Sequence, residues 1–227
     1  MSEPVPNAEL LGSLGRLVRG LSALFWGLPI ALIVCVWSAN PHWFKSFGVA
    51  PGLAATALLV YGVWLLGGFQ RQERVWQAAR DRALLLGLIS FGLSPFLFWF
   101  SQIPMNDFFL VMVVLECLSS LLFVGSLNFV LQRLGAMLPD EGLRAEIRQF
   151  TALNLNLLFL TLAVSLLWFS LTFFRTLPAW LSSLAKLLEN GSFWFLIPLI
   201  LLPIAMTMAL LWKTKEVILD GVFGARR

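Results

Sequence analysis

Residues 108–131 read FFLVMVVLECLSSLLFVGSLNFVL, and this stretch decides the fold of the 227-residue chain. Glu116 is its only charged side chain. The run is long enough to cross the hydrocarbon core of a bilayer as a helix, which takes about 20 residues. It lacks the alternation of apolar and polar residues that is typical of a barrel strand. Because backbone groups in hydrocarbon must pair within their own segment, the stretch predicts a transmembrane α-helix.

Five more apolar runs of similar length, each bounded by charged or turn residues, extend this pattern through the chain. The sequence is 59% hydrophobic and 12% charged, whereas soluble domains are about half apolar and about a quarter charged. We therefore predict an all-α fold, a polytopic transmembrane helical bundle of six spans. The second span is at the lower length limit of about 17 residues. The predicted spans are residues 21–39, 53–69, 83–101, 108–131, 151–174 and 193–212.

The 16 Lys and Arg residues predict the orientation of the bundle. All except Lys45, Arg175 and Lys186 fall in the N-terminal segment, the second loop, the fourth loop or the C-terminal tail. In a six-span chain these four segments lie on one side, and Lys and Arg near the spans are retained in the cytoplasm. The prediction is N-in/C-in. Adding or removing one span would mix the two groups, so the charges support the number of spans independently of hydropathy.

Three regions are expected along the chain. They are a cytoplasmic amphipathic segment at residues 1–20, the six-helix transmembrane domain at residues 21–212, and a basic cytoplasmic tail at residues 213–227. Leucines at helical spacing beside Arg16 and Arg19 fit a helix that lies on the inner leaflet. A cytoplasmic extension of the first span fits them equally well.

Two further segments predict helical extensions into the cytoplasm. Residues 70–82 contain neither Gly nor Pro and are rich in strong helix formers. The turn is therefore expected at Gly67-Gly68, before the third helix. Asp140 is the expected N-cap of the fifth helix. The charged heads are interpreted either as a docking platform for a partner or as solvated helix ends. The candidate docking residues are Arg71, Arg74, Arg80, Arg82, Arg144 and Arg148.

The segment before the last span predicts an interfacial helix on the outer leaflet. Trp180 and several leucines share one face of residues 178–190. Asn190-Gly191 then predicts a helix stop, since these residue types commonly end helices.

Glu116 is the one acidic or basic residue deep within a predicted span. A charge in hydrocarbon is costly, so this side chain is expected to face protein or water. Counting 1.5 Å per residue places polar residues of other spans at comparable depth. Glu116 is interpreted either as a protonation site for coupled transport or as a neutral acid that hydrogen-bonds helices together. The candidate intramembrane polar site comprises Glu116, Tyr61, Ser94, Thr161 and Ser165.

A second polar cluster is expected near the cytoplasmic side. Asn128 of the fourth span and Asn154 and Asn156 of the fifth fall at similar depth. Amides hydrogen-bond across helices in membranes, at about 1 kcal/mol each. The cluster is interpreted as a connection between helices, with a polar vestibule as the alternative.

No catalytic, cofactor-binding or metal-binding pattern is found in the sequence. His42 is the single histidine and falls in an outer loop, so no site built on several histidines can form. The basic residues flank apolar runs rather than forming the patch typical of nucleic-acid binding.

We therefore expect an integral membrane protein of a bacterial inner membrane that is not an enzyme and needs no cofactor. The favoured role is a subunit or scaffold of a larger membrane complex. The expected partners are membrane lipids and other membrane-protein subunits or further copies of the chain. A small transporter or channel that uses the Glu116 region is the first alternative, and a lipid-handling membrane enzyme is the second.

Overall fold

The computed structural model describes residues 8–38, 47–70, 72–103, 106–137, 141–173 and 179–223. Within these ranges the chain forms six α-helices joined by turns, with no strand. This confirms the prediction of an all-α helical bundle. The helices are α1 (Ala8–Ser38), α2 (Ala50–Leu66), α3 (Arg74–Gln102), α4 (Asp107–Met137), α5 (Glu141–Phe173) and α6 (Ala179–Phe223).

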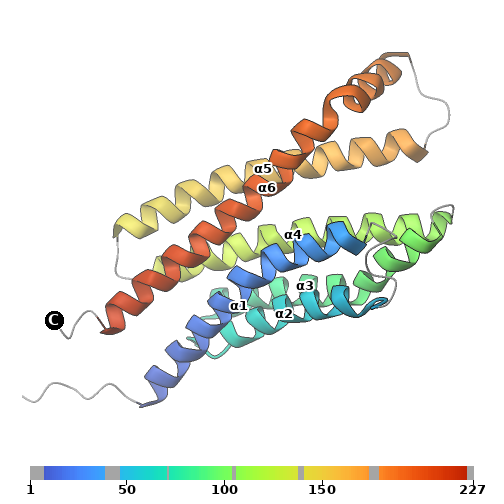
Figure 1. The fold of residues 1–227 in the computed structure, drawn as a ribbon. Coiled ribbons are helices and arrows are strands. Elements are labelled where there is room, and N and C mark those ends of the chain that lie inside the picture. Colours follow the sequence, from blue (N-terminus) through green and yellow to red (C-terminus); the bar gives the residue numbers. More distant parts are fainter. Residues whose placement is uncertain are drawn as a thin grey trace, which may run out of the picture.

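The helices alternate in direction, so that α1 begins and α6 ends at the same end of the bundle (Figure 1). Helix α1 packs along α2, α2 along α3, α3 along α4, α4 along α5, and α5 along α6. Helix α6 also packs on α1 and on α4, which closes the bundle on that side. Helices α3 and α5 flank α4 without contacting each other in the described ranges.

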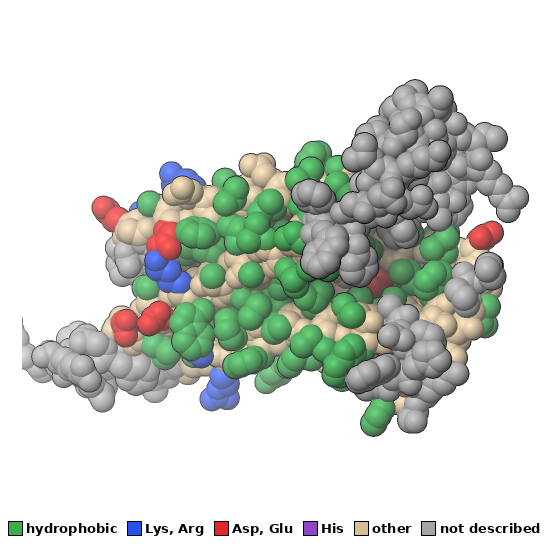
Figure 2. All heavy atoms as spheres, turned by 45° about the horizontal axis from the view of Figure 1, so that its top comes forward, with side chains coloured by type: hydrophobic (Ala, Val, Ile, Leu, Met, Phe, Trp, Pro, Cys, Tyr) green, Lys and Arg blue, Asp and Glu red, His purple; other side chains and the backbone are tan. Residues whose placement is uncertain are grey.

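Five of the described helical segments are long and apolar enough to cross a membrane, in α1, α3, α4, α5 and α6. Helix α2 is also apolar but has 17 residues, the lower limit expected from the sequence. Large apolar side chains point outward along the bundle, among them Trp26 at 62% and Phe159 at 72% exposure. Figure 2 shows these side chains covering the flank of the molecule. An exterior of this kind requires lipid, and the chain is an integral membrane protein.

The buried core lies toward the end where α1 begins and α6 ends. Leu17, Leu21, Trp76 and Leu211 are fully buried there. At the α1–α2 crossing, a Cβ on Gly20 would lie 2.8 Å from the backbone oxygen of Gly62. Glycine is therefore needed for the two helix backbones to approach this closely.

Helix α1 is continuous from Ala8 to Ser38, with no break near residue 20. Leu17 and Leu21 are buried in the core, so this part of α1 packs against the bundle as an extension of the first span. Leu14 and Val18 also pack against this core, whereas residues 1–7 and the side chains of residues 8–11 lie outside what the structure describes.

The predicted stop at Asn190-Gly191 is wrong, since α6 continues through both residues. Asn and Gly cost at most about 1 kcal/mol each inside a helix, which does not by itself end one. The predicted turn at Gly67-Gly68 is confirmed, because α2 ends at Leu66 and both glycines lie in the turn. The expected N-cap at Asp140 lies outside the described residues.

Candidate functional site

A hydrogen-bonded group of side chains joins α4, α5 and α6, and we call it the polar node. It consists of Asn128, Asn154 and Thr207, each fully buried, together with the backbone oxygen of Pro203. The Thr207 hydroxyl accepts from Asn128 Nδ2 at 3.0 Å and from Asn154 Nδ2 at 2.9 Å. It donates to the Pro203 oxygen at 2.8 Å. Asn154 Nδ2 also donates to Asn128 Oδ1 at 3.0 Å.

The polar node contains two of the three asparagines expected in the inner cluster. Asn156 is exposed and does not join it, because residues two apart on a helix do not share a face. Thr207 is the member that sequence reasoning missed. The available signal was its position four residues after Pro203, where its hydroxyl reaches the proline carbonyl.

Thr161 of α5 places its hydroxyl beside a carbonyl oxygen that a proline leaves without its helical partner, and shares its one hydrogen between that oxygen and one in its own helix. Pro203 has no backbone N–H, so the oxygen of Leu199 receives no helical hydrogen bond from it. The Thr161 hydroxyl lies 3.0 Å from that oxygen and 2.8 Å from the Leu157 oxygen in its own helix. Thr161 is 1% exposed. Its role is thus to hold α5 against α6.

The structure does not gather the other expected residues around Glu116. The Ser120 hydroxyl donates to the Glu116 backbone oxygen at 2.8 Å and lies 3.4 Å from carboxylate Oε1. The second oxygen, Oε2, is buried without a hydrogen-bond partner among the described residues. Tyr61 is 50% exposed and stacks on Trp64. Glu116 and Tyr61 were expected together because they lie at a similar depth in the membrane. They are apart because their side chains point in different directions from their helix axes.

Small polar residues near this level join neighbouring helices instead. Ser90 of α3 and Ser119 of α4 share a 2.8 Å hydrogen bond. Ser94 lies 3.5 Å from the Thr56 hydroxyl of α2. Ser165 of α5 is half-buried, and no hydrogen bond joins it to Glu116 in the described part of the chain. These contacts connect helices and reach Glu116 only through its backbone oxygen, which lies 3.0 Å from the Ser119 hydroxyl.

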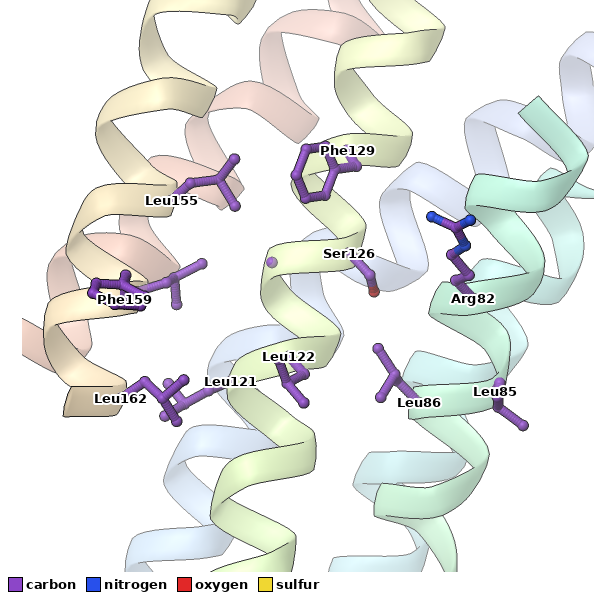
Figure 3. A pocket seen from close by; sticks show the side chains of 12 residues that line it. Arg82, Leu85, Leu86, Leu121, Leu122, Ser126, Phe129, Leu155, Phe159 and Leu162 are labelled. Atoms are coloured by element: carbon purple, nitrogen blue, oxygen red, sulfur yellow. The ribbon is translucent and has the colours of Figure 1, made fainter. Parts of the chain in front are cut away.

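A lateral groove opens between α3 and α5, with α4 as its floor, and has a volume of about 440 Å³. Figure 3 shows Leu86 of α3 and Phe159 of α5 on opposite sides of it. Gly125 and Ser126 contribute small residues to the floor. Arg82 lies at one end, and apart from Ser126, whose hydroxyl donates to the Phe123 oxygen of its own helix, the remaining lining is apolar. The groove is therefore an apolar channel along the bundle with a cation at one end.

The described Lys and Arg side chains belong to the first turns of α3 and α5, the early part of α1 and the last turns of α4 and α6, and Figure 2 shows those on its visible face toward the end where α1 begins and α6 ends. We call this the basic end. Among the candidate docking residues, Arg74, Arg82 and Arg148 are exposed. Arg144 is exposed and takes part in an interaction, and Arg71 lies outside the described residues. Arg80 differs, because its side chain is only 17% exposed.

Helices α5 and α6 are also joined at the basic end by an ion pair between Glu146 and Lys213. Both side chains are partly exposed, at 36% and 43%. Among the described residues, no group of three or more His, Cys, Asp or Glu side chains is placed to hold a metal ion.

Comparisons with protein-family models, with curated proteins and with solved structures found no match to this chain.

Proposed function

We propose that this protein is a non-enzymatic subunit of a larger membrane assembly and that a transmembrane helix of a different protein docks in the α3–α4–α5 groove. The observation that carries the proposal is the groove itself. Its walls are helices that contact α4 but not each other, and its floor holds Gly125 and Ser126. Small residues let helix backbones approach closely in lipid, where packing drives association.

The positive charges at the basic end indicate that the partner carries negatively charged side chains there. Arg82 lines the groove, and Arg133 and Arg148 continue the groove-facing sides of α4 and α5 toward the basic end by helical spacing. All three are exposed, and no ion pair joins them to a described carboxylate. The docking helix is therefore an apolar segment of about 20 residues followed by Asp or Glu at the basic end.

The proposed orientation has both termini in the cytoplasm. It is supported by the position of the described Lys and Arg side chains at the basic end, where α1 begins and α6 ends. The proposed location is a bacterial inner membrane, where this charge bias directs insertion.

Site-specific photocrosslinking in intact membranes tests the proposal. A photoreactive residue at Phe159 in the groove is compared with one at Trp26, which is similarly exposed on α1 and at a similar distance from the basic end. We expect Phe159 to crosslink to an apolar segment of another protein that has acidic residues at its cytoplasmic end, and Trp26 to crosslink only to lipid.

The charge pairing is tested on the same crosslink. Arg82→Glu with Arg148→Glu should abolish it, and exchanging the partner's acidic residues for Lys should restore it. Crosslinks from Phe159 to lipid alone, to a second copy of this chain, or equally from both positions would overturn the proposal.

A further inference from the structure

A separate cavity of about 410 Å³ lies at the basic end, where α1 passes the turn between α2 and α3. The residues that matter for its chemistry are Arg16, Trp64, Gly67, Gly68, Gln77 and Arg80. Its lining, as far as the structure describes it, thus carries two guanidinium groups and no carboxylate. It is distinct from the lateral groove, with which it shares no residue.

The glycine turn is what lets both guanidinium groups come close to the backbone. A Cβ on Gly67 would lie 2.7 Å from Arg80 Nη2, so the guanidinium group would have to shift to admit one. A Cβ on Gly68 would lie 3.2 Å from Arg16 Cζ. Arg80 is therefore held over the turn rather than extended toward a docking partner.

The turn is held in place before any ligand arrives. Trp76 is fully buried and its Nε1 donates to the Phe69 oxygen at 3.0 Å. The Phe69 and Trp76 rings also meet edge to face, with centroids 6.1 Å apart. Such anchoring lowers the ordering cost of binding.

The nitrogen donors at the cavity exceed the acceptors that the protein offers them. Arg80 Nη2 donates to Gln77 Oε1 at 2.9 Å, which orients the amide. Arg80 Nε and Gln77 Nε2 are buried without partners among the described residues. Arg16 is exposed, and no described carboxylate pairs with it.

The Asp81 carboxylate beside Arg80 does not neutralise this surplus. Asp81 Oδ1 lies 3.3 Å from Arg80 Nη1, but its side chain is 63% exposed and it does not line the cavity. Exposed pairs of this kind contribute little. Buried donors without acceptors are costly, and an anion removes that cost.

We propose that this cavity binds a phosphate group, namely that of an anionic phospholipid in the leaflet at the basic end. Arginine pairs with phosphate oxygens through two parallel hydrogen bonds, and the cavity brings two arginines together. The lipid source is favoured by Trp64, which lines the cavity and is 61% exposed on the apolar flank. A phosphate that carries acyl chains can occupy the cavity and cover this ring together.

Lipid binding to the full-length protein tests the proposal. Protein in phosphatidylcholine nanodiscs is titrated with phosphatidylglycerol, and bound lipid is counted by native mass spectrometry. We expect Arg16→Gln to weaken phosphatidylglycerol binding at least tenfold. Arg19→Gln is the matched control, since Arg19 is exposed one turn away and does not line the cavity. It should leave binding within about twofold.

A second variant separates the cavity from simple loss of surface charge. Gly68→Ala keeps the charge and pushes its Cβ toward Arg16, so it should also weaken binding, with an unchanged circular dichroism spectrum. Equal losses in Arg16→Gln and Arg19→Gln, or no preference for phosphatidylglycerol over phosphatidylcholine, would overturn the proposal. Displacement of the lipid by millimolar inorganic phosphate would overturn the lipid assignment in favour of the free anion.

Discussion

Replacing Thr207 by valine removes the centre of the polar node while keeping the shape of the side chain. The hydroxyl accepts one N–H from Asn128 of α4 and one from Asn154 of α5. Hydrogen bonds between transmembrane helices average about 0.6 kcal/mol, so the two together contribute about 1.2 kcal/mol. Asn154 keeps an alternative acceptor, the Pro203 oxygen at 3.2 Å. The expected loss in the free energy of unfolding is therefore about 1–2 kcal/mol.

The assay is equilibrium unfolding of the full-length protein in mixed micelles, followed by loss of helical circular dichroism. Two matched variants accompany it. Asn156→Leu changes an exposed amide on the same helix as Asn154 and should change stability by less than about 0.5 kcal/mol.

Thr214→Val removes a hydroxyl that is fully buried and has no partner among the described residues. Removing an unsatisfied buried group should leave stability unchanged or raise it by up to about 1 kcal/mol. The reasoning is refuted if Thr207→Val is neutral, or if Thr214→Val costs as much as Thr207→Val.

Gly20→Val should lower the unfolding free energy by about 2 kcal/mol or more in the same assay, because the new Cβ meets a backbone oxygen of α2 at 2.8 Å. An unchanged unfolding free energy would argue against the close α1–α2 crossing. Lys213→Ala should lower the unfolding free energy by less than about 1 kcal/mol, since its ion pair with Glu146 is partly exposed, and this loss should shrink at high salt. A larger loss that does not depend on salt would contradict a screened ion pair. In a chain without its two native cysteines, a cysteine at Gln70 should react with an impermeant thiol reagent only from the cytoplasm, and one at Asn106 only from outside. Labelling of both from one side would reject the N-in/C-in arrangement.

The fold was predictable because the backbone groups of a long apolar run in hydrocarbon must pair within their own segment, which requires a helix. The C-terminal end of α2 and the turn after it followed from Gly67-Gly68 and the helix formers beyond them. The sequence did not predict how each helix is rotated about its own axis, and this rotation decides which side chains face one another. Counting residues places Tyr61 and Glu116 at a common depth, but Tyr61 points outward at 50% exposure.

The same limit explains the inner cluster. Asn154 and Asn156 are alike in residue type and nearly alike in depth, yet only Asn154 faces α4 and α6. The spacing from Pro203 indicates only the bond of Thr207 within its own helix, and its contacts with Asn128 and Asn154 depend on the register of α6 against α4 and α5. The position of Arg80 depends in turn on the missing Cβ of Gly67, a relation between two helices that local sequence does not reveal.

The composition of the polar node has a consequence for the membrane potential. A potential acts on charge, at about 2.3 kcal/mol per elementary charge for each 100 mV crossed. The polar node consists of neutral amides and a hydroxyl, so voltage exerts no net force on the contacts that hold α4, α5 and α6 together. The described Lys and Arg side chains lie toward one end of the bundle. Among the described residues Glu116 is then the acidic or basic side chain within an apolar helical stretch on which an electric field can act, and only while it is ionised.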